Sequence, residues 1–300
     1  MGDARAAACR DHQRMRKDLE VRLRRLRTSV DVDELLELGC DLADAGRQGD
    51  AEWCFRRAAE LGEPVAWFNL GNALAGQERY EEAVAAYEQA LAGGEPDAWR
   101  NLGRVLETLG DLAGAMRAYR GAAVAGDLQG GLQLAFLLQE QGEHEQAREV
   151  AEMLAAAGDD EAAAVLACWR WCATRDPSLE ADLRAGADLF PSARGDLAAL
   201  LRETGRPAEA RFVLERGAKR GDVESWLPLG NLYSEEMGDV EAAEEAYRTG
   251  IAAGDVYCHH NLGVLLADRG DVEGAVEQFM LGAAAGDVLA ASALREYDRG

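Results

Sequence analysis

Residue types able to carry chemistry are few in this 300-residue chain, and they are poorly grouped. Two of its four histidines follow a cysteine in the run Cys258-His259-His260. A zinc site needs about four ligands that converge on one ion. Neighbouring residues of a helix project in different directions, and no fourth ligand is evident. The sequence therefore favours a buried cysteine, one packed histidine and one exposed histidine over a metal site.

Cys168 and Cys172 are four residues apart, so on a helix they would share one face. Core packing explains such a pair better than metal binding or redox chemistry does. The sequence also contains no glycine-rich phosphate loop, no paired-cysteine motif and no nucleophile elbow. We therefore expect no catalytic activity, no cofactor and no bound metal.

Charge and hydropathy exclude further classes of function. The chain has 55 acidic and 32 basic residues, a net charge of −23 at pH 7, and such a surface repels the phosphates of nucleic acids. Its longest apolar run, residues 162–169, is far shorter than the ~18 residues that span a membrane. The N-terminus has no apolar stretch of signal-peptide length, so we expect a cytoplasmic protein with reduced cysteines. Only Lys17 and Lys219 are lysines, which indicates a high-GC bacterial genome.

A repeat of about 32 residues runs through most of the chain. A Leu-Gly pair recurs with its glycine at positions 39, 71, 103, 230 and 263, and alanine replaces that glycine at 135, 167 and 198. Alanine stands twelve residues later in most units, and tryptophan stands four residues earlier in three units. An aromatic residue follows sixteen residues after the glycine in five units, with a one-residue insertion before the fourth: Phe55, Tyr87, Tyr119, Tyr247 and Phe279.

This pattern predicts pairs of antiparallel helices. Apolar and small residues recur at three- and four-residue steps, as on one helix face, and the small residues would let two helix axes approach closely. The aromatic rings would fill the gap to the next hairpin, and stacking would bury what one hairpin leaves exposed. Glycines would end the helices. Acidic residues would cap the helices that follow: Asp50, Asp111, Asp127, Asp159, Asp222, Asp239, Asp255, Asp271 and Asp287, with Glu63 and Glu95 in equivalent places.

The segment Trp99-Arg-Asn-Leu-Gly103, with Gly110-Asp111, Ala115, Tyr119 and Ala122, resembles the tetratricopeptide repeat family. The resemblance covers residues 31–287 and implies an all-α, right-handed α-solenoid of about eight helix-turn-helix repeats. The unit departs from the family in being about 32 rather than 34 residues long, and Gly-Asp or Gly-Glu replaces the closing proline. The phrase Gly282-Ala-Ala-Ala-Gly286-Asp287 is similar to the related Sel-like repeats.

One unit of the array, residues 159–190, is irregular. Leu179, Leu183 and Phe190 stand at its consensus positions, and Pro177 and Pro191 interrupt it. The sequence leaves the alignment of this unit with the repeat undecided by one residue. The unit is either a drifted repeat or a hinge between two parts of the array.

The two ends of the chain also differ from the repeats. Residues 1–30 contain nine basic and four acidic side chains and predict a basic N-terminal helix with four apolar residues on one face: Met15, Leu19, Leu23 and Leu26. This helix either caps the first hairpin or docks on an acidic surface. Residues 288–300 predict a C-terminal capping helix, since terminal repeats need a solvated outer face.

In the tetratricopeptide repeat family, the residues two before and one after the repeat glycine face a concave groove. The resemblance places eight residues there: Asn69, Asn72, Asn101, Arg104, Gln133, Phe136, Asn231 and Asn261. Arg100 would share a helix face with Arg104, and His260 and Trp171 are further candidates for the surface. The alternative is that these asparagines belong to the consensus of the repeat and mark no ligand.

Asparagine offers both a donor and an acceptor, so it can pair with the backbone of an extended peptide. The carboxylate clamp of some family members matches only in part, because Phe68, Leu132 and Phe136 stand at its basic positions. We therefore predict a non-catalytic scaffold or adaptor that binds a peptide or protein segment on its concave face and favours basic segments. The alternative is a peptide-responsive regulatory protein whose superhelix changes shape on ligand binding.

Overall fold

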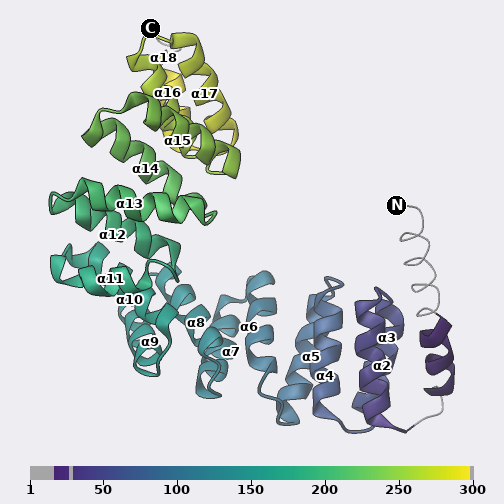
Figure 1. Cartoon of the computed structure of the whole chain (residues 1–300). Helices are drawn as coiled ribbons and strands as arrows, with labels where there is room; N and C mark the ends of the chain where they lie inside the picture. Colours follow the sequence, from purple (N-terminus) through teal and green to yellow (C-terminus); the bar gives the residue numbers. More distant parts are fainter. Residues whose placement is uncertain (1–16, 27–29, 298–300) are drawn as a thin grey trace. The chain divides into compact units, whose positions relative to one another are not determined.

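The computed structural model describes residues 17–26 and 30–297, and this part of the chain consists of helices joined by short turns, without strands (Figure 1). The fold class is therefore the predicted one, an all-α array of helical hairpins. The chain divides into two compact units, residues 1–150 (unit 1) and residues 151–300 (unit 2).

Unit 1 begins, in its described part, with a helix at residues 17–26. Successive helices then run antiparallel along the unit: α2 (Val32–Asp44), α3 (Gln48–Glu60), α4 (Pro64–Ala75), α5 (Tyr80–Ala92), α6 (Ala98–Thr108), α7 (Leu112–Val124), α8 (Leu128–Glu140) and the first half of α9 (His144–Ala156). Each first helix packs on its own second helix, as α4 does on α5, and also on the preceding hairpin, as α4 does on α3.

Unit 2 continues the same alternation with more irregularity. Its helices are α10 (Asp160–Thr174), α11 (Glu180–Gly186), α12 (Pro191–Glu203), α13 (Pro207–Lys219), α14 (Trp226–Leu232), α15 (Val240–Ala253), α16 (Cys258–Asp268), α17 (Val272–Ala284) and α18 (Val288–Tyr297). Three short segments join them: the 3₁₀ turns η1 (Pro177–Leu179) and η2 (Val223–Ser225), and the π-helical turn η3 (Tyr233–Met237).

Glycines and aspartates separate the helices as the repeat predicts. The glycines expected at helix ends have positive φ, for example 90° at Gly126, a conformation that costs other residues more. Asp127 then accepts a hydrogen bond from the Gly130 amide at 3.1 Å. Most of the other predicted aspartates accept such bonds from the next helix start.

Two of the predicted caps are wrong. Asp50 lies within the first turn of α3, where it pairs with Arg47, because that helix begins at Gln48. Glu63 precedes α4 as its N-cap residue but makes no side-chain cap bond. Pro64 itself begins the helix, as proline does favourably at this position.

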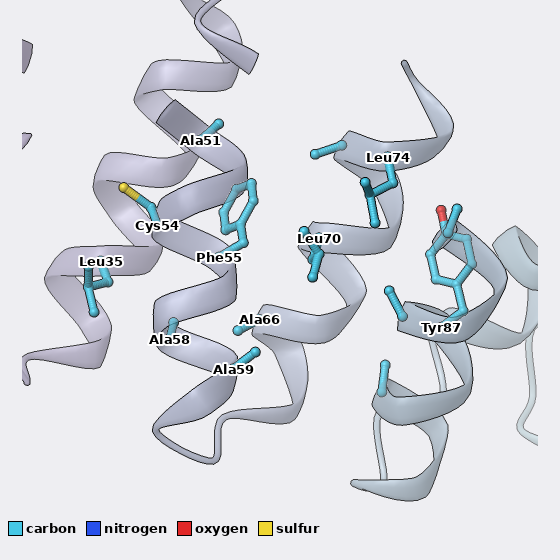
Figure 2. Close-up of a cluster of buried hydrophobic side chains, with 14 of the residues drawn as sticks. Leu35, Ala51, Cys54, Phe55, Ala58, Ala59, Ala66, Leu70, Leu74 and Tyr87 are labelled. Atoms are coloured by element: carbon cyan, nitrogen blue, oxygen red, sulfur yellow. The ribbon is translucent and has the colours of Figure 1, made fainter. Parts of the chain in front are cut away.

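Each repeat glycine makes room for an aromatic ring of its own hairpin. A Cβ added to Gly39 would lie 2.5 Å from Cε1 of Phe55, and one added to Gly71 would lie 2.5 Å from Cε1 of Tyr87. Gly103, Gly230 and Gly263 meet Tyr119, Tyr247 and Phe279 in the same way. The sequence predicts that these rings fill the gap to the next hairpin. It does not predict that each ring packs against the glycine of its own hairpin. Figure 2 shows Phe55 and Tyr87 within the buried cluster that they share with leucines and alanines of α2 to α5.

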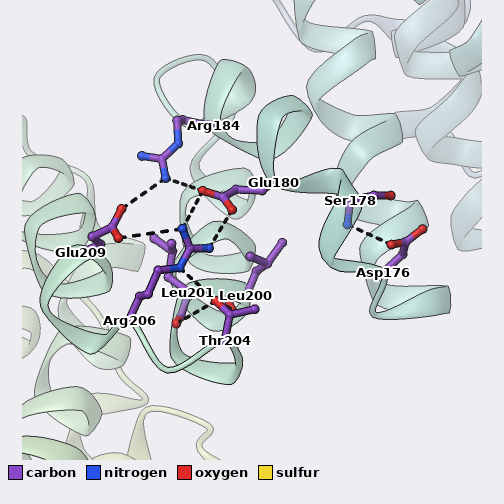
Figure 3. Close-up of polar contacts among 9 residues, drawn as sticks. All are labelled: Asp176, Ser178, Glu180, Arg184, Leu200, Leu201, Thr204, Arg206 and Glu209. Atoms are coloured by element: carbon purple, nitrogen blue, oxygen red, sulfur yellow. Dashed lines mark hydrogen bonds and ion pairs between the residues drawn. The ribbon is translucent and has the colours of Figure 1, made fainter.

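The irregular unit keeps a hairpin but shortens its second helix. Arg175, with φ at 52°, ends α10, and Pro177 and Pro191 both stand at the start of a helical segment. The second helix, α11, has only seven residues. Figure 3 shows the ion pairs around this helix. Glu180 accepts hydrogen bonds at 2.6 and 3.1 Å from Arg206 of the next hairpin. It also accepts one at 2.7 Å from Arg184 of α11 itself.

The extra residue after Gly230 is absorbed by η3. A π-helical turn holds one residue more than an α-turn, so the chain resumes the repeat at Gly238, whose φ is 63°. Arg202 of α12 donates hydrogen bonds to Glu235 at 2.8 Å and to Glu236. The insertion thus leaves the packing of Gly230 against Tyr247 unchanged.

The helix at residues 17–26 packs on the first hairpin. Leu19, Leu23 and Leu26 are buried in one cluster with the leucines of α2. Arg22 forms an ion pair with Asp41 at 2.6 Å, and Arg25 pairs with Glu34. These are contacts that a capping helix makes. Met15 and the rest of residues 1–16 lie outside the described part of the chain.

Candidate functional site

The predicted site residues fall into two groups, one in each unit. Asn69 and Asn72 lie on α4, and Arg100, Asn101 and Arg104 lie on α6, so these five belong to unit 1. Unit 2 holds the other three, on α14 and α16: Asn231, His260 and Asn261.

The asparagines link neighbouring hairpins through a tyrosine. The Asn72 Oδ1 atom accepts hydrogen bonds from the Tyr87 hydroxyl at 2.8 Å and from Asn101 Nδ2 at 2.7 Å. Burial raises the pKa of Tyr87 to about 12, so its hydroxyl stays a donor at neutral pH. These bonds support the alternative in which Asn72 serves the repeat. Within the described residues, Asn72 Nδ2 and Asn101 Oδ1 form no such link between hairpins.

Unit 2 repeats the same link despite its insertion. Asn231 Oδ1 accepts hydrogen bonds from the Tyr247 hydroxyl at 2.8 Å and from Asn261 Nδ2 at 2.6 Å. Tyr247 follows its asparagine by 16 residues, whereas Tyr87 follows its asparagine by 15. The turn η3 therefore conserves the hydrogen bonds as well as the packing.

The link is missing at the third hairpin, and a hollow opens there. Arg104 takes the place of the asparagine, and the Tyr119 hydroxyl donates instead to Glu107 at 2.8 Å. The hollow has a volume of about 620 Å³ and is lined from α6, α7 and α8 by Arg100, Asn101, Arg104, Glu107, Thr108, Tyr119, Gln129 and Gln133. Arg100, Asn101 and Arg104 thus line one cavity, together with Gln133, which the family pattern also placed in the groove.

A second hollow adjoins the first. Its volume is about 470 Å³, and it shares Asn101, Arg104 and Thr108 with its neighbour. Its other lining residues include Asn72 of α4 and Tyr80 of α5. We call the two hollows together the unit 1 groove. Asn69 lines neither hollow, and Phe136, predicted from the family pattern, lines neither as well.

The groove carries positive charge in a strongly acidic chain. Arg100 Nε lies 3.1 Å from Asp127 Oδ2, and Asp127 also caps α8. The exposed guanidinium of Arg104 forms no ion pair within the described residues. Arg104 is therefore the cation of the groove that a ligand can reach without displacing a carboxylate.

In the larger hollow, sequence reasoning missed four lining residues: Glu107, Thr108, Tyr119 and Gln129. A signal existed, because Arg100, Arg104, Glu107 and Thr108 recur at three- and four-residue steps and so share one face of α6. Tyr119 gave no such signal, since its ring also fills the core against Gly103.

Cys258, His259 and His260 are held by packing and by hydrogen bonds. Cys258 is fully buried, as predicted, and burial raises the pKa of its thiol, with Asp255 adding to the shift. Both histidines are half-buried, so the expectation of one exposed ring is wrong. His259 Nδ1 lies 2.9 Å from Gln278 Oε1, and the His260 ring packs on Phe279 at 5.9 Å. The described residues contain no group of three or more candidate metal ligands.

Two further expectations about α10 are corrected. Trp171 was a surface candidate, but only 1% of it is exposed, and it belongs to a buried cluster that includes Leu183 of α11 and Leu197 of α12. Cys168 is buried as predicted for core packing, whereas Cys172 is exposed, so the two thiols do not share a buried face. Among the described residues, no helix has the length and apolar character needed to cross a membrane.

The hairpin geometry agrees with comparisons of the sequence. Family models described as tetratricopeptide repeat match residues 36–97, 71–129, 128–153, 191–216, 223–253 and 256–279. The chain belongs to the tetratricopeptide repeat family. These matches leave out residues 154–190, which contain the short helix α11. Proteins of this repeat class generally mediate protein–protein interactions.

Several solved structures match the chain at low sequence identity, and the first of those reported below shows the same fold. A Sel1 repeat protein from Oxalobacter formigenes has a TM-score of 0.70 at 21% identity, covering 92% of this chain and 90% of that chain. The antigen c5321 of uropathogenic Escherichia coli, which has an SLR fold, has a TM-score of 0.49 at 23% identity, with 92% and 73% covered. A human IFIT1 dimer with PPP-AAAA has a TM-score of 0.50 at 15% identity, with 91% and 72% covered. No curated protein matches the chain.

Proposed function

We propose that this chain is a non-catalytic scaffold or adaptor that binds an extended protein segment in the unit 1 groove, on the concave face expected for the family. The observation that carries the proposal is the pair of adjoining hollows, which share Asn101, Arg104 and Thr108. A groove that runs from α4 to α8 suits an extended chain better than a compact small molecule.

The polar lining of the groove suits peptide backbone. Asn101 Oδ1, Asn72 Nδ2 and the exposed Gln133 amide offer acceptors and donors for main-chain groups. Arg104 would anchor a carbonyl or carboxylate of the segment, because guanidinium donates in a planar fork. Arg100 would add to this anchor when it leaves Asp127. The net charge of −23 would attract basic residues that flank the anchored group.

The proposal is tested with the partner captured from the native host. We expect Asn101→Ala combined with Arg104→Ala to weaken binding of that partner at least about 10-fold, since a few central residues, often including arginine, contribute most of the affinity of an interface. Arg117→Ala is the matched control, because Arg117 is exposed on α7 and lines neither hollow. Circular dichroism checks that each variant folds.

The single variant Arg104→Ala makes the test sharper. Asn101→Ala also removes the bond to Asn72, whereas Arg104→Ala leaves the whole Asn72–Tyr87–Asn101 link in place. Retained affinity in the single and the double variant would overturn the proposal. The regulatory alternative differs in its effect on shape: small-angle scattering that is unchanged by bound ligand would exclude it.

A further inference from the structure

We propose that unit 2 contains a second binding site, which receives the side chain of an arginine or lysine of a partner protein. The site is a hollow of about 230 Å³ among α13, α14, η3 and α15; Figure 1 labels α13, α14 and α15. Trp226, Leu229 and Tyr233 line it from the first helix of the hairpin, and Glu215, Lys219 and Glu245 line it from the two second helices. We call it the unit 2 hollow, and it does not depend on the unit 1 groove.

Tyr233 distinguishes this hairpin from the others in the chain. It stands three residues after the repeat glycine, where six other units have leucine: Leu42, Leu74, Leu106, Leu138, Leu201 and Leu266. Most of these leucines are buried, whereas Tyr233 begins the π-helical turn and is only half-buried. Its hydroxyl donates to Glu215 of the preceding hairpin at 2.9 Å. The unit therefore replaces a core leucine by a ring that lines a hollow.

The aromatic residues suit a cation. The face of a tryptophan or tyrosine ring attracts ammonium and guanidinium groups through its quadrupole. Trp226 and Tyr233 line the same hollow, and Leu229 lies beside them. This apolar lining would cover the methylene stem of a long basic side chain, which packs on apolar surface while its charged head stays polar.

Two of the three charged residues that line the hollow, Glu215 and Glu245, are carboxylates, and the third is Lys219. The carboxylate of Glu245 forms no ion pair or hydrogen bond within the described residues, although its carbonyl accepts from Thr249 at 2.8 Å. Glu215 is already compensated, by Arg211 at 3.5 Å and by Lys219 at 3.9 Å. Glu245 is thus the carboxylate available to an incoming cation, and the net charge of −23 favours the approach of a basic partner.

The test uses the full-length chain labelled with 5-fluorotryptophan. Its probes are N-acetyl-arginine amide and N-acetyl-citrulline amide, which have the same shape but differ in charge. We expect the arginine probe to shift the Trp226 fluorine signal saturably, and the citrulline probe to bind about five-fold more weakly. The signal of Trp226 is assigned with Trp226→Phe. No saturable shift, or equal affinity for both probes, would overturn the proposal.

Two variants and one control locate the contacts. Glu245→Gln and Tyr233→Leu should each weaken the arginine probe about three- to five-fold, and Tyr233→Leu restores the residue that other units already contain. Glu241→Gln is the control, because Glu241 is exposed on α15 outside the hollow and its loss changes the net charge equally. Asn101→Ala with Arg104→Ala should leave the Trp226 shift unchanged, which separates this site from the unit 1 groove. An equal loss in Glu241→Gln would show a general charge effect and contradict the proposal.

Discussion

At the scale of single residues, the repeat couples a glycine to an aromatic ring. Where glycine is replaced by alanine, at 135, 167 and 198, the residue sixteen positions later is Ala151, Leu183 or Leu214. The five units that keep glycine have a ring instead, and a Cβ on the glycine would lie 2.3–2.5 Å from that ring. A glycine on the first helix of a hairpin therefore occurs with an aromatic ring on the second helix, and an alanine occurs with a smaller side chain.

This coupling predicts a double-mutant effect. Gly39→Ala should destabilise the chain by about 1–3 kcal/mol, because the added methyl group overlaps the Phe55 ring in a closely packed core. Combining it with Phe55→Leu should cost less than the sum of the two single changes, since the smaller side chain relieves the overlap. Urea unfolding followed by circular dichroism measures each difference.

Gly49→Ala is the control for this prediction. Gly49 is also helical, but nothing lies within 4 Å of an added Cβ. Gly49 is the second residue of α3, where alanine gains less over glycine than the roughly 1 kcal/mol of a helix interior, so this variant should be as stable as the wild type or slightly more stable. Destabilisation in the control, or additive losses in the Gly39 and Phe55 cycle, would contradict the steric explanation.

At the scale of elements, the short helix α11 depends on charge as well as on burial. It has seven residues, about half the length of the other second helices, so it buries less apolar surface. Hydrogen bonds from Arg206 and Arg184 lower the pKa of Glu180 to about 2. The ion pair with Arg206 joins α11 to α13, and the one with Arg184 stays within α11.

The lowered pKa predicts an acid dependence. Because the folded-state pKa of Glu180 lies below its unfolded value of about 4.5, the ionised carboxylate stabilises the fold above that pH, and this stabilisation is lost as the pH falls toward about 2. Glu180→Gln should therefore lower the urea midpoint of unit 2 near neutral pH. The difference from wild type should shrink as the pH falls below about 4.5.

A suitable control is Glu203→Gln, which removes a single exposed ion pair with Arg175. Exposed pairs contribute little, so the control should differ from wild type by less than Glu180→Gln does. A difference between Glu180→Gln and wild type that stays constant with pH would refute the assignment of this stabilisation to the Glu180 carboxylate.

The fold was predictable from sequence wherever a single residue type satisfies a local requirement of the backbone, such as a positive φ or a helix cap. Gly126 and Asp127 end one helix and begin the next through local geometry alone, so the spacing of such residues suffices. Asp50 follows a glycine too, but its helix starts earlier and Arg47 pairs with it. Trp171 was misplaced because the buried cluster to which it belongs is completed by residues of other helices, such as Leu183 and Leu197.

The candidate site was only half predictable for the same reason. The family pattern located Asn72 and Asn101, yet their mutual hydrogen bond depends on the spacing of two hairpins and on the Tyr87 hydroxyl between them. The hollow at Arg104 lies where the asparagine–tyrosine link is absent. A missing hydrogen-bond link has no sequence motif by which it could be predicted. The unit 2 hollow could not be predicted from the sequence either, because it depends on Tyr233, which begins the π-helical turn η3.

At the scale of the whole molecule, the net charge of −23 has a structural origin in part. Capping aspartates such as Asp127 and Asp271 accept hydrogen bonds from free amides at helix starts, and a negative charge there also interacts favourably with the helix dipole. The remaining excess is not offset by such contacts. Long-range repulsion among these carboxylates should therefore lower the stability of the folded chain.

This repulsion predicts that salt stabilises the protein. Raising NaCl from about 0.01 M to about 0.15 M shortens the screening length from about 30 Å to about 8 Å, which weakens distant repulsion strongly. Contact pairs such as Arg206 with Glu180, at 2.6 Å, and the capping bonds are much shorter than either length and lose less. We therefore expect the melting temperature, measured by circular dichroism, to rise over this range, with an uncharged osmolyte at equal osmolarity as the control. A fall in melting temperature would mean that the local ion pairs outweigh the repulsion, and would assign the acidity to structure rather than to the attraction of basic partners.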